Sequence, residues 1–134
     1  MERLVERADT TGSTFVSLTP ARVLDTRYGT GLSGKLSANT PVTFQVTGQG
    51  GVPSVASAVT GNLTVVNSTS SWAVFVGPAP AVSPTTSSVN FSAGVTVANG
   101  ITVALSATGT LSATYLSLSG NTTDLIFDVT GYYP

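Results

Sequence analysis

The sequence contains no cysteine and no histidine. Without cysteine the fold has no disulfide, and no thiolate is available as a nucleophile or a metal ligand. Without histidine the chain lacks the side chain that most often serves as a general base or as a metal ligand near neutral pH. The two absences remove the commonest designs of hydrolytic and metal-dependent active sites.

Charge is also scarce, since Asp, Glu, Lys and Arg make up 8% of the 134 residues, compared with about 25% in a typical soluble domain. The formal net charge is −1, so no basic surface is present that would attract the phosphates of a nucleic acid. A surface with so little charge repels other copies weakly, which favours a place in a protein assembly or on an exterior surface.

Long apolar runs are absent as well, because no stretch of 18 apolar residues occurs and none predicts a transmembrane helix. The N-terminal residues MERLVERAD are too charged for a signal peptide. We expect a complete protein that is not exported by that route, and a piece excised from a longer exported chain is the alternative. The length fits one domain.

Residues 1–14 differ from the rest of the chain. They hold five of the eleven charged residues, and Leu4 and Val5 are their only large apolar residues after Met1. A helix this short is marginal on its own. Two interpretations stay open, a disordered tail and an arm that becomes ordered against a neighbouring subunit through Leu4 and Val5.

From residue 15 onward the pattern is typical of β-structure. Apolar residues alternate with polar ones in segments 42–46, 59–66 and 125–133, and the last of these puts Leu125, Phe127, Val129 and Tyr133 on one face. Segment 72–76 is apolar on both faces, which suits a strand covered on both sides or buried in an interface. Clusters of Gly, Pro and Ser separate the segments. Residues 15–134 therefore predict a single antiparallel β-sandwich of jelly-roll or immunoglobulin-like topology.

Residues 95–105 contain Asn99-Gly100, the dipeptide most typical of a hairpin turn. A two-residue turn there would point the apolar sets of the two arms in opposite directions. In one uninterrupted strand, the apolar residues from Val95 to Leu105 share a face. We predict the continuous strand, with a bulge or a close backbone approach at Gly100, and keep the hairpin as the alternative.

The stretch RVLDTRYGTG, residues 22–31, concentrates charge in a chain that has no charged residue between Lys35 and Asp124. Gly29, Gly31 and Gly34 match the spacing of a dinucleotide-binding loop. That motif requires a following helix and an acidic residue about 20 positions later. Here Pro41 and a strand follow instead, so no cofactor is expected.

Beyond residue 14 the only carboxylates are Asp25, Asp124 and Asp128. A glycosidase needs two carboxylates across a sugar bond, but Asp124 and Asp128 lie roughly 13 Å apart along a strand and lack flanking aromatic clusters. We predict no enzyme activity and no catalytic residue. Calcium binding by Asp25 with loop carbonyls is a weaker alternative. Lys35 lies in a Gly/Ser loop and is expected to be a solvated charge.

Arg22, Asp25 and Arg27 are instead interpreted as one side of a structural tie, with Asp124 and Asp128 as its other side. Asp128 stands in a predicted strand, where an unpaired buried carboxylate would be costly. We therefore expect an arginine to pair with Asp128, and loss of one partner of such a buried pair would cost about 3–5 kcal/mol.

Two aromatic residues are candidates for an interaction surface, together with Leu4 and Val5 of the arm. Tyr28 lies on the glycine-rich loop, where exposed contact residues are common. Trp72 begins the segment that is apolar on both faces.

Four stretches in this order resemble a β-module found in exported proteins of actinobacteria and Chloroflexi and in structural proteins of their phages: PARVLDTR (20–27), TGQGGVP (47–53), SSVNFSAGVTVANGITVAL (87–105) and DLIFDVTGYY (124–133). The resemblance covers residues 15–133 and implies a β-sandwich without catalysis and without an established ligand site. The family usually has an apolar residue where Gly100 stands, which supports the continuous strand. The residues that match the motifs are taken as structural: Arg22, Asp25, Arg27, Asn90, Asn99 and Asp128.

The resemblance and the low charge together suggest a non-enzymatic phage virion surface component, a head-decoration or tail protein. It would assemble with other copies of itself and with a larger capsid or tail through the sandwich and the arm. The alternative is an extracellular or cell-wall module of a secreted protein that binds polysaccharide or another protein. Neither role involves nucleic acid or membrane insertion.

Overall fold

A computed structural model describes residues 12–134 of the chain. This part of the chain forms no helix, and so none that is long and apolar enough to cross a membrane. Its nine strands are β1 (Val16–Asp25), β2 (Leu36–Ser37), β3 (Val42–Gln45), β4 (Ala58–Val66), β5 (Trp72–Gly77), β6 (Val89–Phe91), β7 (Val97–Ala104), β8 (Thr110–Leu116) and β9 (Thr122–Tyr133).

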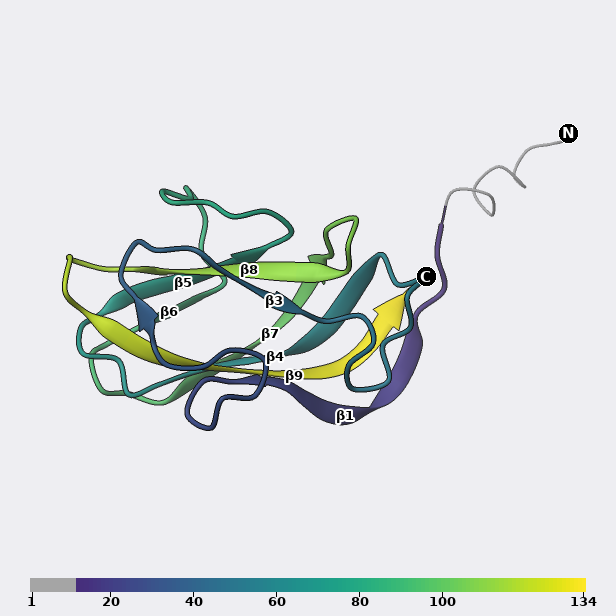
Figure 1. Ribbon diagram of the computed structural model, residues 1–134, viewed down its shortest axis with the longest axis horizontal. Coiled ribbons are helices and arrows are strands. Elements are labelled where there is room, and N and C mark those ends of the chain that lie inside the picture. The colour runs from purple at the N-terminus through teal and green to yellow at the C-terminus, as the bar shows by residue number, and fades with distance from the viewer. Residues whose placement is uncertain (1–11) are drawn as a thin grey trace, which may run out of the picture.

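The strands form two antiparallel sheets that pack face to face (Figure 1). One sheet has the order β1-β9-β4-β7, with the short β2 paired to the beginning of β9. The other has the order β3-β8-β5-β6. The chain is therefore the single β-sandwich that its period-two pattern predicts.

The strand order decides between the two topologies that the sequence left open. The first strand lies beside the last, and apart from β2 every strand is followed by one in the opposite sheet, except that β6 follows β5 in the same sheet. This is the order of an eight-stranded jelly roll. In an immunoglobulin-like sandwich the first strand would instead pair with the second.

The core lies between the sheets and is built from the inward faces of the strands. In β4 burial alternates residue by residue, and Val59, Leu63 and Val65 are completely buried, as the sequence pattern predicts. β5 is covered on both faces, which is one of the two arrangements expected for it, and the connection between β5 and β6 folds over the outer side of this sheet. The Thr114 hydroxyl of the neighbouring β8 donates to the carbonyl of Ala81 in that connection at 2.6 Å.

One face assignment in β9 is wrong at its end. Phe127 and Val129 are completely buried, but Tyr132 rather than Tyr133 packs against the core. The register with β4 shifts by one residue beyond Val129, which is a β-bulge. Because side chains alternate along a strand, one extra residue exchanges the two faces from that point on. Tyr133 instead contacts Phe15, with ring centroids 5.5 Å apart.

The continuous strand around Asn99-Gly100 is confirmed, since β7 runs without interruption from Val97 to Ala104. The predicted bulge or close approach at Gly100 is wrong. Eight consecutive residues of β7 pair with β4 without a register shift, and a Cβ on Gly100 would meet nothing within 4 Å. Asn99 extends its side chain to the connection between β5 and β6, where its amide donates to the carbonyl of Ser88 at 2.8 Å.

Candidate functional site

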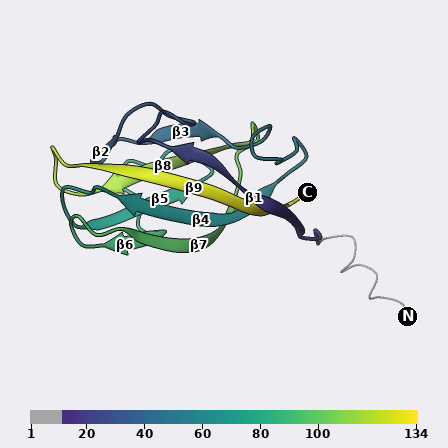
Figure 2. The same cartoon turned by 90° about the horizontal axis from the view of Figure 1, so that it is seen from below.

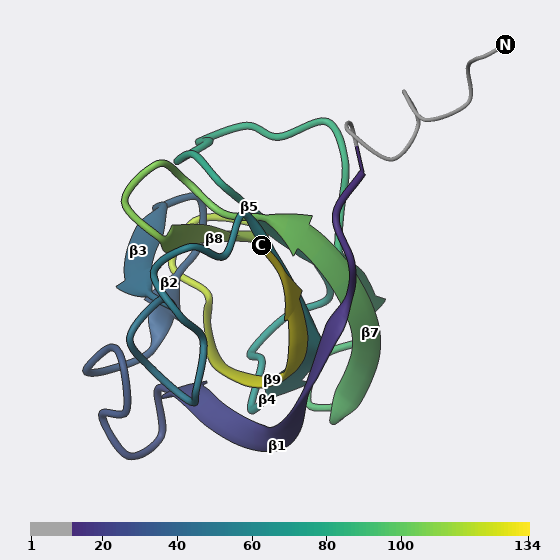
Figure 3. The same cartoon turned by 90° about the vertical axis from the view of Figure 1, so that its right-hand side faces the viewer.

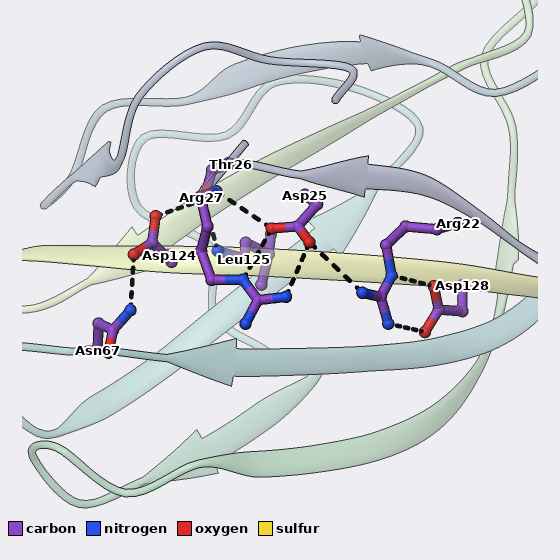
Figure 4. A network of polar contacts seen from close by, with 8 residues as sticks. All are labelled: Arg22, Asp25, Thr26, Arg27, Asn67, Asp124, Leu125 and Asp128. Carbon is purple, nitrogen blue, oxygen red and sulfur yellow. Dashed lines mark hydrogen bonds and ion pairs between the residues drawn. The ribbon is translucent and has the colours of Figure 1, made fainter. Parts of the chain in front are cut away.

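Pairing of β1 with β9 brings Arg22 directly opposite Asp128. Two hydrogen bonds join the side chains, from Nε to Oδ1 at 2.8 Å and from Nη2 to Oδ2 at 3.1 Å (Figure 4). The predicted pairing of an arginine with Asp128 is confirmed. The expected burial is wrong, because the Arg22 side chain is 48% exposed and that of Asp128 is 24% exposed. Water therefore screens the pair, and such pairs contribute about 1 kcal/mol or less.

Asp25 is the buried centre of the arginine side of the cluster and is 1% exposed. Arg27 donates to it three times, from Nε at 3.0 Å, from Nη2 at 2.8 Å and from its backbone N–H at 3.1 Å. Arg22 Nη1 approaches the same carboxylate at 3.4 Å. The hydrogen bonds from Arg27 hold the pKa of Asp25 below its ordinary value in spite of its burial.

Asp124 is the second buried carboxylate, 3% exposed, and its partners are not arginines. It accepts hydrogen bonds from Thr26 Oγ1 at 2.8 Å, from Lys35 Nζ at 2.5 Å and from Asn67 Nδ2 at 2.9 Å. Burial alone would raise the pKa of Asp124, but the hydrogen bonds from Lys35, Asn67 and Thr26 outweigh it and lower the pKa. The prediction that Asp124 meets the arginines is wrong, and so is that of a solvated Lys35.

The six charged side chains of residues 12–134 form two ion-paired groups, which lie next to each other because Thr26, between Asp25 and Arg27 in the chain, donates to Asp124. We call the two groups together the charge cluster: Arg22, Asp25, Arg27 and Asp128 in one, and Lys35 and Asp124 in the other. Three are positive and three negative, and the remainder of the described surface carries no charged side chain. The cluster links the first strand, the loop that follows it and the last strand. Its contribution to the free energy of unfolding stays a prediction.

The geometry of the charge cluster disfavours a metal site. Within residues 12–134 no three acidic, histidine or cysteine side chains gather closely enough to hold a metal ion. Asp25, the alternative calcium ligand, has both carboxylate oxygens occupied by arginine donors.

Tyr28 lies beside the cluster on the glycine-rich loop and is 78% exposed. The Arg27 guanidinium stacks over its ring, 5.0 Å from the centroid, which is a cation–π contact. Leu4 and Val5, the other candidates from the arm, lie outside the described residues.

Trp72, the first residue of β5, is exposed, although the two residues that follow it in the strand are buried. Strict alternation would place it with Val74 and Val76 on the core side, yet its side chain is 60% exposed. Its φ is +138°, a backbone conformation that bulky residues rarely adopt. Because of this distortion at the start of β5, the indole ring points into solvent instead of into the core.

Buried groups fix the backbone just before Trp72. The hydroxyl of Tyr115, which is completely buried, donates to the carbonyl of Ser70 at 2.6 Å and accepts from the N–H of Ser70 at 3.3 Å. The N–H of Thr69 donates to the carbonyl of Thr122 at 2.9 Å. The strained residue therefore stands on a chain segment that is held from two neighbouring strands.

Two open pockets flank the indole ring, and we call them together the Trp72 surface. The first has a volume of about 560 Å³ and is lined by Ser70, Ser71, Trp72, Asn90, Phe91, Ser117 and Leu118. The second has a volume of about 280 Å³ and is lined by Trp72, Ala73, Pro84, Thr85, Thr86, Ser87, Asn90 and Leu116. The larger pocket is in the size range of small-ligand sites, and neither pocket contains a charged residue.

Asn90 belongs to both pockets, and its amide is oriented by a neighbour. The Ser87 hydroxyl donates to Asn90 Oδ1 at 3.0 Å, and the Asn90 NH₂ group has no partner within residues 12–134. Asn90 was expected to be structural from its place in the VNF motif, and Leu118, which is 75% exposed, was not among the predicted surface residues. The one available signal was a large apolar residue in the turn LSGNTT.

The Trp72 surface lies at the end of the sandwich opposite to the described chain ends. Leu118 stands in the turn before β9, and β9 then runs the length of the sandwich to Tyr133 (Figure 1). There the Ser13 hydroxyl donates to the carbonyl of Pro134 at 2.7 Å.

No family model matches the chain, and no curated protein is similar to it in sequence. The resemblance to the exported β-module stays an expectation.

Proposed function

We propose that this chain is a non-enzymatic binding module that holds an uncharged polysaccharide on its Trp72 surface. The observation that carries the proposal is the exposed Trp72 ring, which stands between two uncharged pockets lined by hydroxyl groups. A sugar ring has an apolar C–H face that packs on an aromatic ring, and hydroxyls around its rim that exchange hydrogen bonds. The indole, the serine and threonine hydroxyls and the free NH₂ of Asn90 supply both kinds of contact.

The carboxylates of the described residues support a role without catalysis. Each is paired with a cation in the charge cluster, and none lines either pocket of the Trp72 surface. A general acid that works near neutral pH needs a raised pKa, whereas the pKa values of Asp25 and Asp124 are lowered.

The backbone of Trp72 supports a binding role in a second way. A strained residue persists only where its surroundings over-determine it, and such residues cluster at ligand-binding positions. The hydrogen bonds of Tyr115 hold this segment before any ligand arrives. A ring that is already ordered loses little entropy on binding.

The test uses the fact that Trp72 is the only tryptophan of the chain. Its fluorescence is titrated with neutral soluble polysaccharides, a β-glucan and a mannan, and with polygalacturonate as the anionic comparison. We expect a neutral polymer to shift the emission, and Trp72→Ala to weaken retardation in affinity electrophoresis by about tenfold or more.

Tyr28→Ala is the matched control, because it removes another exposed aromatic ring, which lies outside the Trp72 surface. It should bind like the wild type. Binding that survives Trp72→Ala, or an emission spectrum that no neutral polymer changes, would contradict the proposal.

The second candidate is a surface component of a phage virion. It is favoured by the absence of charged side chains from the described surface outside the charge cluster, which lets protein copies pack without repulsion. The resemblance to structural proteins of phages points the same way. Mass spectrometry of purified particles is the test: the chain should be present in amounts that match a repeating position, and its absence would exclude this role.

A further inference from the structure

The sandwich has four sheet edges, formed by β1 and β7 in one sheet and by β3 and β6 in the other. An edge strand exposes unpaired N–H and C=O groups to which another chain can pair. Natural proteins therefore block their edges with short strands, charges, prolines or bulges.

Three of the four edges carry such a device. β1 contains Pro20 and Arg22, and its register with β9 is interrupted twice. β3 has four residues and β6 has three, so neither offers a long ladder.

β7 carries none of these devices. Its eight residues, Val97–Ala104, include no charge and no proline, and they pair with β4 without a register shift. Figures 2 and 3 show β7 at the outer edge of its sheet. No backbone group of this strand bonds to any residue other than those of β4 within residues 12–134.

We infer that a second copy of this chain pairs with the free edge of β7, so that two β7 strands run antiparallel about a two-fold axis and join their sheets. One register sets the edge against itself about the axis. With Gly100 opposite Gly100, Val97 lies opposite Val103 of the second copy, Ala98 opposite Thr102 and Asn99 opposite Ile101. The two valines form an apolar pair, the other two pairs each set a polar residue against an apolar one, and no pair brings like charges together.

Two further observations favour a second copy as the occupant. Gly100, at the axis, has no side chain, and a Cβ there would meet nothing within 4 Å, so the faces of the sheet are uncrowded where the two strands cross the axis. All charged side chains of the described chain belong to the charge cluster, and the β1 residues among them lie on the opposite edge of the sheet. Two copies therefore approach through β7 with no charge repulsion at the contact.

The test is the mass in solution, measured by light scattering over a dilution series up to millimolar concentration. We expect twice the chain mass of 13.5 kDa at high concentration and the single-chain mass on dilution. Gly100→Lys places two lysines opposite each other at the axis, and the open space around Gly100 admits the side chain. This variant should keep the far-UV circular dichroism of the wild type and have the single-chain mass throughout.

Two control variants separate pairing at β7 from other causes. Gly100→Ala should pair like the wild type. Thr19→Lys adds the same charge to the β1 edge, which is not part of the proposed contact, so this variant should also reach the doubled mass. A wild type that stays a single chain at every concentration, or a Gly100→Lys variant that retains the doubled mass, would overturn the inference. Either result leaves the polysaccharide proposal untouched, because that is tested at Trp72.

Discussion

Replacing Asp124 with alanine is expected to destabilise the fold far more than the same change at Asp128, although the two aspartates lie four residues apart on β9. Their surroundings differ. The Asp124 side chain is 5% exposed and that of Asp128 is 24% exposed. Asp124 accepts hydrogen bonds from three residues of distant segments, while Asp128 is held by Arg22 alone.

The magnitude follows from the groups that each change leaves behind. Asp124→Ala leaves the hydroxyl of Thr26, a buried donor, without its acceptor, which costs about 1–3 kcal/mol. It also removes the charge-assisted hydrogen bond from Lys35, which is worth about 1.5–3 kcal/mol when solvent screening is ignored. Lys35 is 45% exposed, so water replaces part of that loss. We expect about 3 kcal/mol in total for Asp124→Ala and about 1 kcal/mol or less for Asp128→Ala, whose partner is already hydrated.

The measurement is urea unfolding followed by far-UV circular dichroism, with the free energies of unfolding compared at equal denaturant dependence. Asp124→Asn is the matched control. It keeps an oxygen that can accept from Thr26 but loses the charge, so its loss should fall between those of the two alanine variants. Equal losses for Asp124→Ala and Asp128→Ala, or a larger loss at Asp128, would refute the reasoning from burial.

Two further predictions concern pH and glycine. The pKa values of Asp25 and Asp124 are lowered in the folded state, so their stabilisation is present above the unfolded pKa of about 4 and is lost as pH falls through the folded values; urea unfolding between pH 6 and pH 2 should show this decline, and a flat profile would contradict it. Gly61→Ala should lower the melting temperature strongly, because its Cβ would lie 2.5 Å from the Asp128 carbonyl oxygen. Gly100→Ala in the paired strand should be neutral or stabilising by up to about 1 kcal/mol, because its Cβ meets nothing. Equal melting temperatures for the two variants would contradict this explanation.

The sandwich was predictable because its strongest signal is local. Side chains of a strand alternate between faces, so the inward set of β4 can be read from spacing alone. β8 carries no such signal, since Ser112 and Thr114 are buried among apolar residues. Their hydroxyls are satisfied by Thr43 and by the carbonyl of Ala81, partners 69 and 33 residues away. No pattern within the strand reveals such partners in advance.

The candidate sites, like the fold, could be predicted from the sequence only in part. The pairing of an arginine with Asp128 could be expected, because a lone carboxylate within a strand needs a cation. Its exposure could not, because that depends on the loops around β1. The role of Lys35 was missed because its place in a Gly/Ser loop gives no sign that the loop folds back onto the buried Asp124 of β9.

The sequence by itself determined the period-two strands and the available chemistry, since both depend only on which residues are present and how they are spaced. It excluded thiol and imidazole chemistry and limited the described charges to six side chains. The tertiary structure alone decided which cation meets which carboxylate, because that choice depends on strand order and register. The tertiary structure also directs the Trp72 ring to solvent through one strained φ angle. It makes β7 the one edge strand of the described sheets without a charge, a proline, a bulge or a short length. Both features arise from packing between segments that are distant in the chain.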